Sequence, residues 1–367
     1  MELADLRTSI PALERLSWLA TPSSAPGATP VIRAIAEELR QWSDGLVSWA
    51  DRDRPAQRSR QLMAELLGVR AADIALVQST AAAAATVGWS LPDGARIVVG
   101  TQEFRSNVFP WLAAERRGAT VVQVPMPDGQ LTSSALVDAI DDRTHLVAVS
   151  SVQSASGSRV DLVPVAERCR QVGARLFVDA TQSAGVLRLP EGVDADFVAA
   201  HGYKWLLGVR GAGWLYVRPD RLPELDPLAP SSATAADFDR IYGGPLQFAP
   251  DARRLDLPTG WPSWAGAAAG LELISALDPV QVEDHALALA GRLRDGATAI
   301  GLRCLPTEVP SQIIAVAHPE AEQCLVELEA ADVIATARAG AVRFGFHAFN
   351  TAEDVDRALA VLGAQAS

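Results

Sequence analysis

Short runs of apolar, mostly β-branched residues alternate with helical segments over the middle of this chain. Six runs are expected to form buried strands, at residues 96–100, 120–124, 145–150, 175–179, 196–200 and 213–217. Helical periodicity lies between several of them, for example over 108–117 and 162–172. This alternation predicts an α/β architecture, in which a mostly parallel sheet lies between helices.

Helices are also expected before the strands, over 31–42 and 56–67. Gly68 is placed to end the second of them in the left-handed conformation. The alanine run at 81–85 predicts the beginning of a further helix, whose small side chains allow close packing against a neighbour.

The alternation stops between residues 220 and 260, where the sequence becomes rich in proline, serine and alanine. This composition is typical of a loop and marks a candidate domain boundary. Helices are expected again near 264–276, 279–299 and 351–362, with strands among them. We therefore predict a large domain over residues 21–247 and a smaller C-terminal α+β domain over 248–367, with residues 1–20 packed on the smaller one.

Charge and residue usage disfavour several classes of function. The 367 residues carry a formal net charge of -12, which argues against nucleic-acid and anionic-membrane partners. The three cysteines lie far apart and the five histidines form no paired metal motif, so no disulfide framework or metal site is expected. The first residues lack the apolar core of a signal peptide, and no apolar run reaches membrane-spanning length. We expect a soluble, cytoplasmic protein.

Of the 32 lysine and arginine residues, one is a lysine, Lys204. Arginine is thus accepted wherever a positive charge suffices. A guanidinium stays protonated in proteins, whereas an ε-amine can lose its proton when desolvated and attack a carbonyl. The alternative is that Lys204 is a chance survivor on the surface, and its sequence surroundings argue against this.

Asp179 lies at the end of a predicted strand, and Lys204 follows another predicted strand 25 residues later (204 − 179). Ligand-binding groups of α/β proteins gather at such strand ends. The pair suits pyridoxal 5′-phosphate, because the amine forms a Schiff base with the aldehyde while the carboxylate keeps the ring nitrogen protonated. Gln182 is placed to hydrogen-bond the phenolic oxygen of the ring. An isolated Asp179 would instead be a turn residue.

A nucleotide-binding domain would also fit alternating strands and helices. However, no G-x-G-x-x-G follows the first strand, and no G-x-x-x-x-G-K-[ST] occurs because Trp205 follows the only lysine. Nucleotide binding is therefore disfavoured.

Two segments, VDATQSAG (178–185) and DADFVAAHGYKWLLGVRGAGWLYV (194–217), resemble the cofactor region of class V aminotransferases. These are fold-type I pyridoxal-phosphate enzymes that include cysteine desulfurases, selenocysteine lyases, kynureninases and proteins like isopenicillin N epimerase. WLATPSSAPGATPVIRAI (18–35) and VRFGFHAFNTAEDVDRAL (342–359) are similar to the two ends of family members. The resemblance implies a seven-stranded sheet in the large domain, pyridoxal 5′-phosphate as cofactor, an amino-acid substrate and a homodimer with shared active sites.

The resemblance also implies roles for residues around the cofactor. Lys204 would form the Schiff base and act as the catalytic base, Asp179 would pair with the ring nitrogen, and Gln182 would bind the phenolic oxygen. The phosphate would lie at a helix N-terminus, where free backbone N–H groups attract anions. The residues that would hold the phosphate are Ser79, Thr80, Ala81, His201 and Tyr203. An ordinary helix cap is the alternative for Ser79 and Thr80, and both roles can hold together.

Other positions match the family pattern less completely. Phe104 would stack on the cofactor ring, and Asn107 would lie beside the substrate. Ser154 stands where desulfurases have an asparagine, and Gln153 could compensate as a cofactor ligand. Thr259 resembles a residue that reaches the phosphate in the partner subunit, although Pro258 replaces a glycine beside it.

Arg343 matches the family arginine that binds the substrate's α-carboxylate, and a planar guanidinium suits bidentate recognition of that group. A surface or interdomain ion pair is the alternative. The segment Trp18–Pro26 and the side chains of Trp261 and Trp264 are candidate selectivity elements, although aromatic residues near a dimer contact more often serve packing.

The reaction is expected at Cα of an amino acid, through intermediates in which the substrate is bonded to the cofactor. The segment IATARAGAVRFG (334–345) contains no cysteine before Arg343, and Cys324 reads as a buried helix residue. We therefore expect no persulfide-forming desulfurase. Elimination at Cβ from a cysteine-derived conjugate (C–S lyase type), in secondary metabolism, is favoured over transamination and over epimerisation or racemisation. An inactive binding subunit is the remote alternative.

Overall fold

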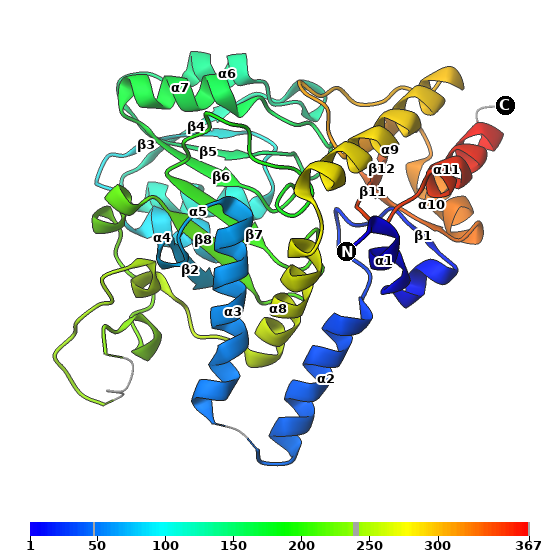
Figure 1. Cartoon of the computed structure of the whole chain (residues 1–367). Helices are drawn as coiled ribbons and strands as arrows, with labels where there is room; N and C mark the ends of the chain where they lie inside the picture. The colour runs from blue at the N-terminus through cyan, green and yellow to red at the C-terminus, as the bar shows by residue number, and fades with distance from the viewer. Residues whose placement is uncertain (47, 238–241, 366–367) are drawn as a thin grey trace.

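The computed structural model describes residues 1–46, 48–237 and 242–365. Seven strands form its central sheet (Figure 1). In spatial order they are β2 (Ile74–Val77), β8 (Gly213–Val217), β7 (Phe197–His201), β6 (Arg175–Asp179), β5 (Thr144–Ser150), β3 (Arg96–Gly100) and β4 (Thr120–Val124). All are parallel except β8, which pairs antiparallel with both β7 and β2. The predicted mostly parallel α/β sheet is confirmed.

Alternation along each strand sends side chains to two separate apolar layers. In β2, Ile74 and Leu76 join the cluster under α3 (Trp49–Leu67), α6 (Ser133–Ala139), α7 (Leu162–Val172) and α8 (Trp261–Ser275). Ala75 and Val77 join the cluster on the other face, beneath α4 (Thr80–Trp89) and α5 (Phe109–Ala114). Because both faces are covered, the strands read as continuous apolar runs.

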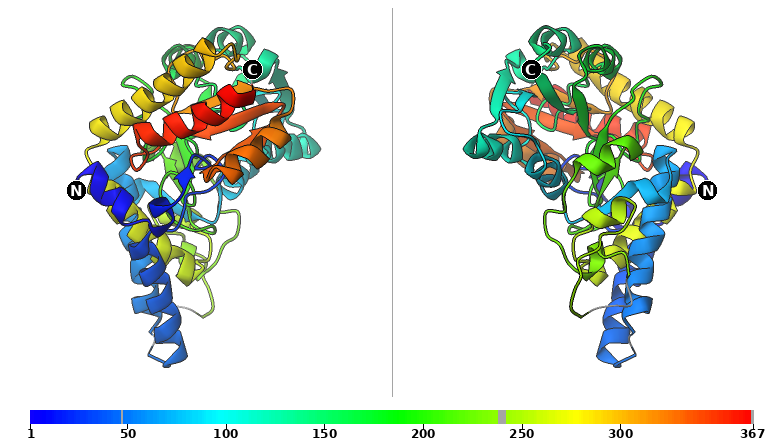
Figure 2. Two further views of the ribbon diagram at one scale, coloured as in Figure 1. Left: turned by 90° about the vertical axis from the view of Figure 1, so that its right-hand side faces the viewer. Right: turned by 90° about the vertical axis from the view of Figure 1, so that its left-hand side faces the viewer.

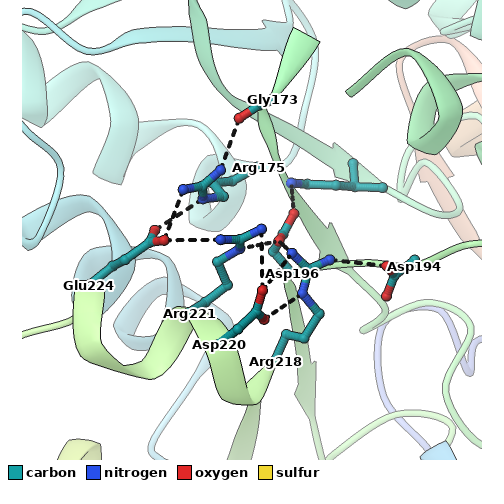
Figure 3. A network of polar contacts seen from close by, with 9 residues as sticks. Gly173, Arg175, Asp194, Asp196, Arg218, Asp220, Arg221 and Glu224 are labelled. Carbon is teal, nitrogen blue, oxygen red and sulfur yellow. Dashed lines mark hydrogen bonds and ion pairs between the residues drawn. The ribbon is translucent and has the colours of Figure 1, made fainter. Parts of the chain in front are cut away.

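Polar side chains connect neighbouring strands at the end of the sheet where β6 and β7 begin and β8 ends. Asp196 is buried just before β7; it accepts hydrogen bonds from the Leu176 backbone N–H and the Arg221 guanidinium, and forms an ion pair with Arg218 at 2.6 Å (Figure 3). Arg221 lies in the 3-10 helix η6 (Pro219–Glu224), which also supplies a carboxylate to Arg175. This network fixes the strands at their ends opposite to Asp179 and His201.

A smaller sheet of three antiparallel strands lies beside the central one. It has the order β11 (Thr336–Arg338), β12 (Ala341–Gly345) and β9 (Ile313–Ala317). Its apolar cluster also contains residues of α9 (Pro279–Ala299), α10 (Ala321–Ala330) and α11 (Ala352–Gln365), which lie together in Figure 1.

The N-terminal segment packs on this smaller unit. Leu6 of α1 (Leu3–Thr8) and Leu13 belong to the same apolar cluster as Phe344, and β1 (Ser17–Trp18) pairs in parallel with β10 (Val333–Ile334). Helix α8, by contrast, contributes Trp264 to the core under the seven-stranded sheet. The domain boundaries proposed from the sequence stay predictions.

Helices α2 (Thr29–Ser43) and α3 both project from the body of the molecule (Figure 2), and each packs against α8. Helix α3 begins at Trp49, earlier than predicted, with the Ser48 hydroxyl capping the Asp51 N–H. Pro55 therefore lies inside the helix. Gly68 ends the helix with φ 68°, as predicted. The predicted helix over 108–117 divides into α5 and the 3-10 turn η4 (Glu115–Arg117).

Gly345 connects the small sheet to the N-terminal segment. Its N–H donates to the Leu19 carbonyl at 2.8 Å, and a Cβ there would lie 2.4 Å from Pro22 Cδ. No larger residue can therefore occupy this position without moving the segment that follows Leu19.

We expect Gly345→Ala to destabilise the protein by about 1–3 kcal/mol, as overpacking of a core does. The matched control is Gly291→Ala in α9, where a Cβ would meet no atom within 4 Å and should add up to about 1 kcal/mol of stability. Denaturant unfolding of the two variants measures both effects. Equal stability of the two would contradict the packing of residues 19–22 described here.

Candidate active site

Three neighbouring parallel strands end at one edge of the central sheet with polar side chains. The register places Ser150 of β5 beside Asp179 of β6, and Asp179 beside Ala199 of β7, which ends at His201. A cavity of about 100 Å³ opens above these strand ends. The predicted site residues that line it are Ser79, Thr80, Phe104, Ser154, Asp179, Gln182, His201, Tyr203 and Lys204.

Lys204 lies buried in the loop between β7 and β8. Its Nζ is 5.6 Å from the centre of the Phe104 ring and 5.4 Å from that of the Tyr203 ring, and it donates no hydrogen bond to any described side chain. Burial lowers the pKa of Lys204 from 10.5 to about 8, although the nearby Asp179 raises it. About a tenth of the amine is therefore uncharged and nucleophilic at pH 7, far more than for an ordinary lysine.

Asp179 is buried at the end of β6, and its Oδ1 accepts a hydrogen bond from the Thr181 N–H at 2.9 Å. Burial raises the pKa of Asp179, against the opposing effect of its hydrogen bonds to Thr181. A buried carboxylate with spare acceptor capacity gains from a cationic partner. The protonated ring nitrogen of pyridoxal phosphate is such a partner.

Gln182 lies between the cavity and the N-terminal segment. Its Oε1 accepts from Trp205 Nε1 at 2.8 Å, while its Nε2 donates to the Pro22 carbonyl and to Ser154 Oγ, each at 3.0 Å. These bonds hold the amide plane in one orientation at the cavity wall. Sequence reasoning did not foresee that Gln182 ties two distant segments together.

The opposite end of the cavity has the features of an anion site. Ser79 caps α4, with its Oγ accepting from the Ala82 N–H at 3.2 Å, so the first backbone N–H groups of α4 point toward the cavity end. Gly213 lies under this turn, where a Cβ would approach the Ala200 carbonyl to 2.9 Å. Thr80 Oγ1 and Thr181 Oγ1 are hydrogen-bonded at 2.7 Å.

His201 faces the same end. Burial, with Lys204 and Arg210 nearby, lowers the pKa of His201 to about 4, so the imidazole is neutral near neutral pH. Its Nε2 is buried and has no hydrogen-bond partner in the described part of the chain. A phosphate oxygen would satisfy this atom. Together with Asp179 and Lys204, these groups fit pyridoxal 5′-phosphate.

Arg343 lies next to this cavity, on β12. Its Nη2 donates to Ser23 Oγ at 2.7 Å, its Nε and Nη2 donate to Thr336 Oγ1, and its Nη1 donates to the Ser154 carbonyl. Burial lowers the pKa of Arg343 to about 9, and no carboxylate pairs with it among the described residues. A buried cation without an anionic partner is a candidate carboxylate site.

Arg343 borders a second, larger pocket of about 570 Å³ that also reaches Lys204 and Phe104. The N-terminal segment forms one wall of this pocket through Pro22, Ser23, Ser24 and Ala25. Of the segment Trp18–Pro26, which was predicted to contribute to selectivity, these four residues line the pocket.

Four predicted positions lie away from the cavity centre. Asn107 is buried, where it accepts from Trp111 Nε1 at 3.3 Å and donates to Ser150 Oγ at 3.5 Å. Gln153 Nε2 donates to Glu103 Oε1 at 2.9 Å. Thr259 Oγ1 donates to Asp53 at 3.2 Å. Ala81 lies in the first turn of α4, one residue beyond Thr80. Their roles toward cofactor and substrate stay predictions.

The two tryptophans considered for selectivity differ. Trp264 is buried against Trp214, with ring centres 5.6 Å apart, and serves the core. Trp261 is partly exposed, with the Arg52 guanidinium 4.3 Å from its ring centre.

The structure also brings residues to the site that the sequence did not single out. Ser23 and Thr336 orient Arg343, and Arg210 and Arg338 border the larger pocket. Glu103 is buried behind Ser150, whose N–H and Oγ both donate to it, and burial raises its pKa. The position of Glu103 directly before Phe104 was the one available signal.

Comparison with known proteins identifies the family. Residues 18–358 match the aminotransferase class-V family. The chain belongs to this family. Its members are pyridoxal-phosphate enzymes, so the predicted cofactor and the predicted enzymatic nature are confirmed at this level.

Individual relatives carry two kinds of name. The chain is 28% identical over 318 residues to a probable cysteine desulfurase of Methanothermobacter thermautotrophicus, covering 83% of this chain and 78% of the relative. It is 29% identical over 369 residues to an uncharacterized aminotransferase, YcbU, of Bacillus subtilis, covering 98% and 97%.

Solved structures share the fold. An apo cysteine desulfurase from Thermococcus onnurineus superposes with a TM-score of 0.85 at 22% identity, covering 98% of this chain and 97% of that one. A complex of the cystine C–S lyase C-DES with cysteine persulfide gives a TM-score of 0.85 at 22% identity, covering 96% and 99%. The predicted fold-type I architecture is confirmed.

The depressed pKa of Lys204 predicts the pH dependence of cofactor attachment. Only the neutral amine attacks the aldehyde, so the rate of Schiff-base formation by apoprotein should rise with pH through a midpoint near 8 and level off above it. The visible absorption of the Schiff base, and its loss on borohydride reduction, report the rate. Lys204→Ala should show no such band. A rate still rising steeply toward pH 10.5 would contradict the described burial of Lys204.

Proposed function

We propose that this enzyme is a C–S lyase that acts by β-elimination on a cysteine-derived conjugate. The observation that carries the proposal is that residues expected to hold pyridoxal phosphate line the pocket region, and that no cysteine is among the described residues that line it. Lys204, Asp179 and Gln182 line one cavity, and Arg343 borders the adjoining pocket.

A persulfide-forming enzyme needs a cysteine thiolate that reaches the substrate sulfur. Here a two-residue turn, Ala339 and Gly340, joins β11 directly to β12. Both residues have positive φ, 50° and 75°, as type I′ hairpin turns require. This hairpin has no room for an extended loop that could carry a nucleophile to the pocket.

The cysteines of the chain lie elsewhere. Cys169 and Cys324 are buried in α7 and α10, and burial raises the pKa of Cys169 to about 12. Cys304 is half-buried beside β9, and burial raises its pKa as well. Raised pKa values disfavour the thiolate forms of Cys169 and Cys304, so these two residues are poor acceptors of sulfur.

When bound, pyridoxal phosphate supplies an electron sink for negative charge at the substrate's Cα. Arg343 holds the α-carboxylate, and Ser23 and Thr336 fix the guanidinium plane. Lys204 Nζ takes the proton from Cα. The Cβ–S bond then breaks, and the sulfur leaves with the bonding electrons as a thiolate. Overall, the conjugate and one water yield pyruvate, ammonia and a thiol.

Arg343→Gln tests the assigned carboxylate site. Loss of a charge-assisted hydrogen bond costs about 1.5–3 kcal/mol, so kcat/KM should fall about tenfold to a hundredfold, mainly through KM. Arg357→Gln on α11, which removes an exposed ion pair with Glu353, is the matched control and should leave kinetics unchanged. Retention of the visible band and of the melting temperature shows that the variant is folded. A normal KM in folded Arg343→Gln would contradict the assignment.

Product analysis distinguishes the possible reactions. With S-substituted cysteines the enzyme should release pyruvate and ammonia in equal amounts. Removal of sulfur from cysteine by a desulfurase would leave alanine, transamination would leave a sulfur-containing keto acid, and epimerisation would leave the D-amino acid. Any of these as the main product, or no turnover by fully loaded enzyme, would reject the proposal.

A homodimer also remains a proposal. Helices α2 and α3 expose Ile32, Trp42 and Trp49 by 53%, 65% and 72%. Exposed apolar side chains of this size mark interaction surfaces. The family resemblance of the sequence also implies a homodimer. Thr259 was predicted to bind the phosphate in the partner subunit. To do so, its Oγ1 would have to give up the hydrogen bond that it now donates to Asp53.

No described helix is long and apolar enough to cross a membrane. A cytoplasmic location stays a prediction. The described residues also contain no group of three or more side chains suited to hold a metal ion.

A further inference from the structure

The larger pocket has a charge imbalance that the proposed reaction leaves unexplained. Four of its lining side chains are cationic: Lys204, Arg210, Arg338 and Arg343. The described residues that line it include no carboxylate. Four cations gathered around one pocket without an acid favour anionic ligands there.

The cofactor would account for two of these cations. Lys204 would be bonded to it. Arg210 also borders the smaller cavity with Ser79, Thr80 and His201, the end suited to a phosphate, and its guanidinium lies 4.9 Å from the centre of the Tyr203 ring. A dianionic phosphate is therefore the natural partner of Arg210.

The substrate is the ligand that would face the remaining two. The α-carboxylate supplies one negative charge to Arg343. Arg338 is then unmatched: its printed hydrogen bond, at 2.6 Å, goes to the neighbouring Ala337 carbonyl, and no described carboxylate forms an ion pair with it. Burial is the main cause of the lowered pKa of Arg343, and the charge of the nearby Arg338 lowers this pKa further.

Backbone geometry fixes Arg338 near the pocket rim. It is the last residue of β11, paired with Ala341 across the two-residue turn, while Thr336 of the same strand pairs with Arg343. The hairpin therefore carries the carboxylate-binding arginine and a second arginine at a set spacing. Arg338 is exposed, so it can meet a substrate group that extends away from the cofactor.

We propose that the substrate carries a second anionic group on its side chain, and that Arg338 binds this group and thereby determines specificity. The inference rests on the proposed function in one respect, the placing of the α-carboxylate at Arg343. The ligand class is an α-amino acid with a carboxylate or sulfonate at the end of its side chain.

Binding of unreactive acids tests the inference without turnover. Succinate and glutarate are each compared with their half-amides, succinamate and glutaramate, by thermal shift and calorimetry on the holoenzyme. The diacids should bind about tenfold more tightly than the half-amides, because a charged hydrogen bond is replaced by a neutral one. Arg338→Gln should abolish this preference, and Arg357→Gln should preserve it.

Turnover provides the second arm. S-carboxymethyl-L-cysteine and S-carbamoylmethyl-L-cysteine have the same shape and differ in one charge. The wild-type kcat/KM should favour the acid about tenfold, and Arg338→Gln should equalise the two. Equal binding of acids and amides by the wild type, or an unchanged preference in Arg338→Gln, would overturn the inference.

The two arms separate this inference from the proposed reaction. Pyruvate released equally from both conjugates would keep the lyase and reject the role of Arg338. An Arg338-dependent preference for diacids without pyruvate from either conjugate would keep the anionic substrate class and reject the lyase.

Discussion

The buried guanidinium of Arg343 holds the candidate site together. It donates to Ser23 in the N-terminal segment, to Ser154 in the loop after β5 and to Thr336 in the neighbouring strand. Three parts of the chain, more than 300 residues apart at the extremes, thus meet at one side chain. All of these partners are neutral, so the positive charge remains available. A carboxylate partner would have occupied the guanidinium and blocked the binding of an anion.

Much of the architecture could be predicted because buried parallel strands leave a local signal. Four of the six predicted strands have the predicted bounds, β5 begins one residue earlier than predicted, and β7 is displaced by one residue. Strand β2, Ile74–Val77, was missed because four apolar residues after a helix are too short to distinguish from a helix end. The antiparallel direction of β8 depends on pairing across the sheet and leaves no local trace.

The site was predicted unevenly for a similar physical reason. Lys204 and Asp179 stood out through rarity and spacing, and Arg343 through its family motif. Ser23, Thr336 and Glu103 are ordinary polar residues whose partners are distant in sequence, so their roles appear only in the folded chain. Helix α3 shows the opposite error: it was predicted over 56–67, yet it begins at Trp49 and continues through Pro55, where proline costs the helix a backbone hydrogen bond.

The cationic pocket stands in contrast to the acidic protein around it. A net charge of -12 repels anions at long range, whereas the arginines at the pocket act at short range. At physiological ionic strength the Debye length is about 8 Å, so the distant acidic surface is largely screened from a ligand in the pocket. The local field of Arg338 and Arg343 therefore decides binding there. The acidic residues elsewhere on the surface lower its affinity for anions. A doubly anionic substrate would therefore be attracted at the pocket and at few other places.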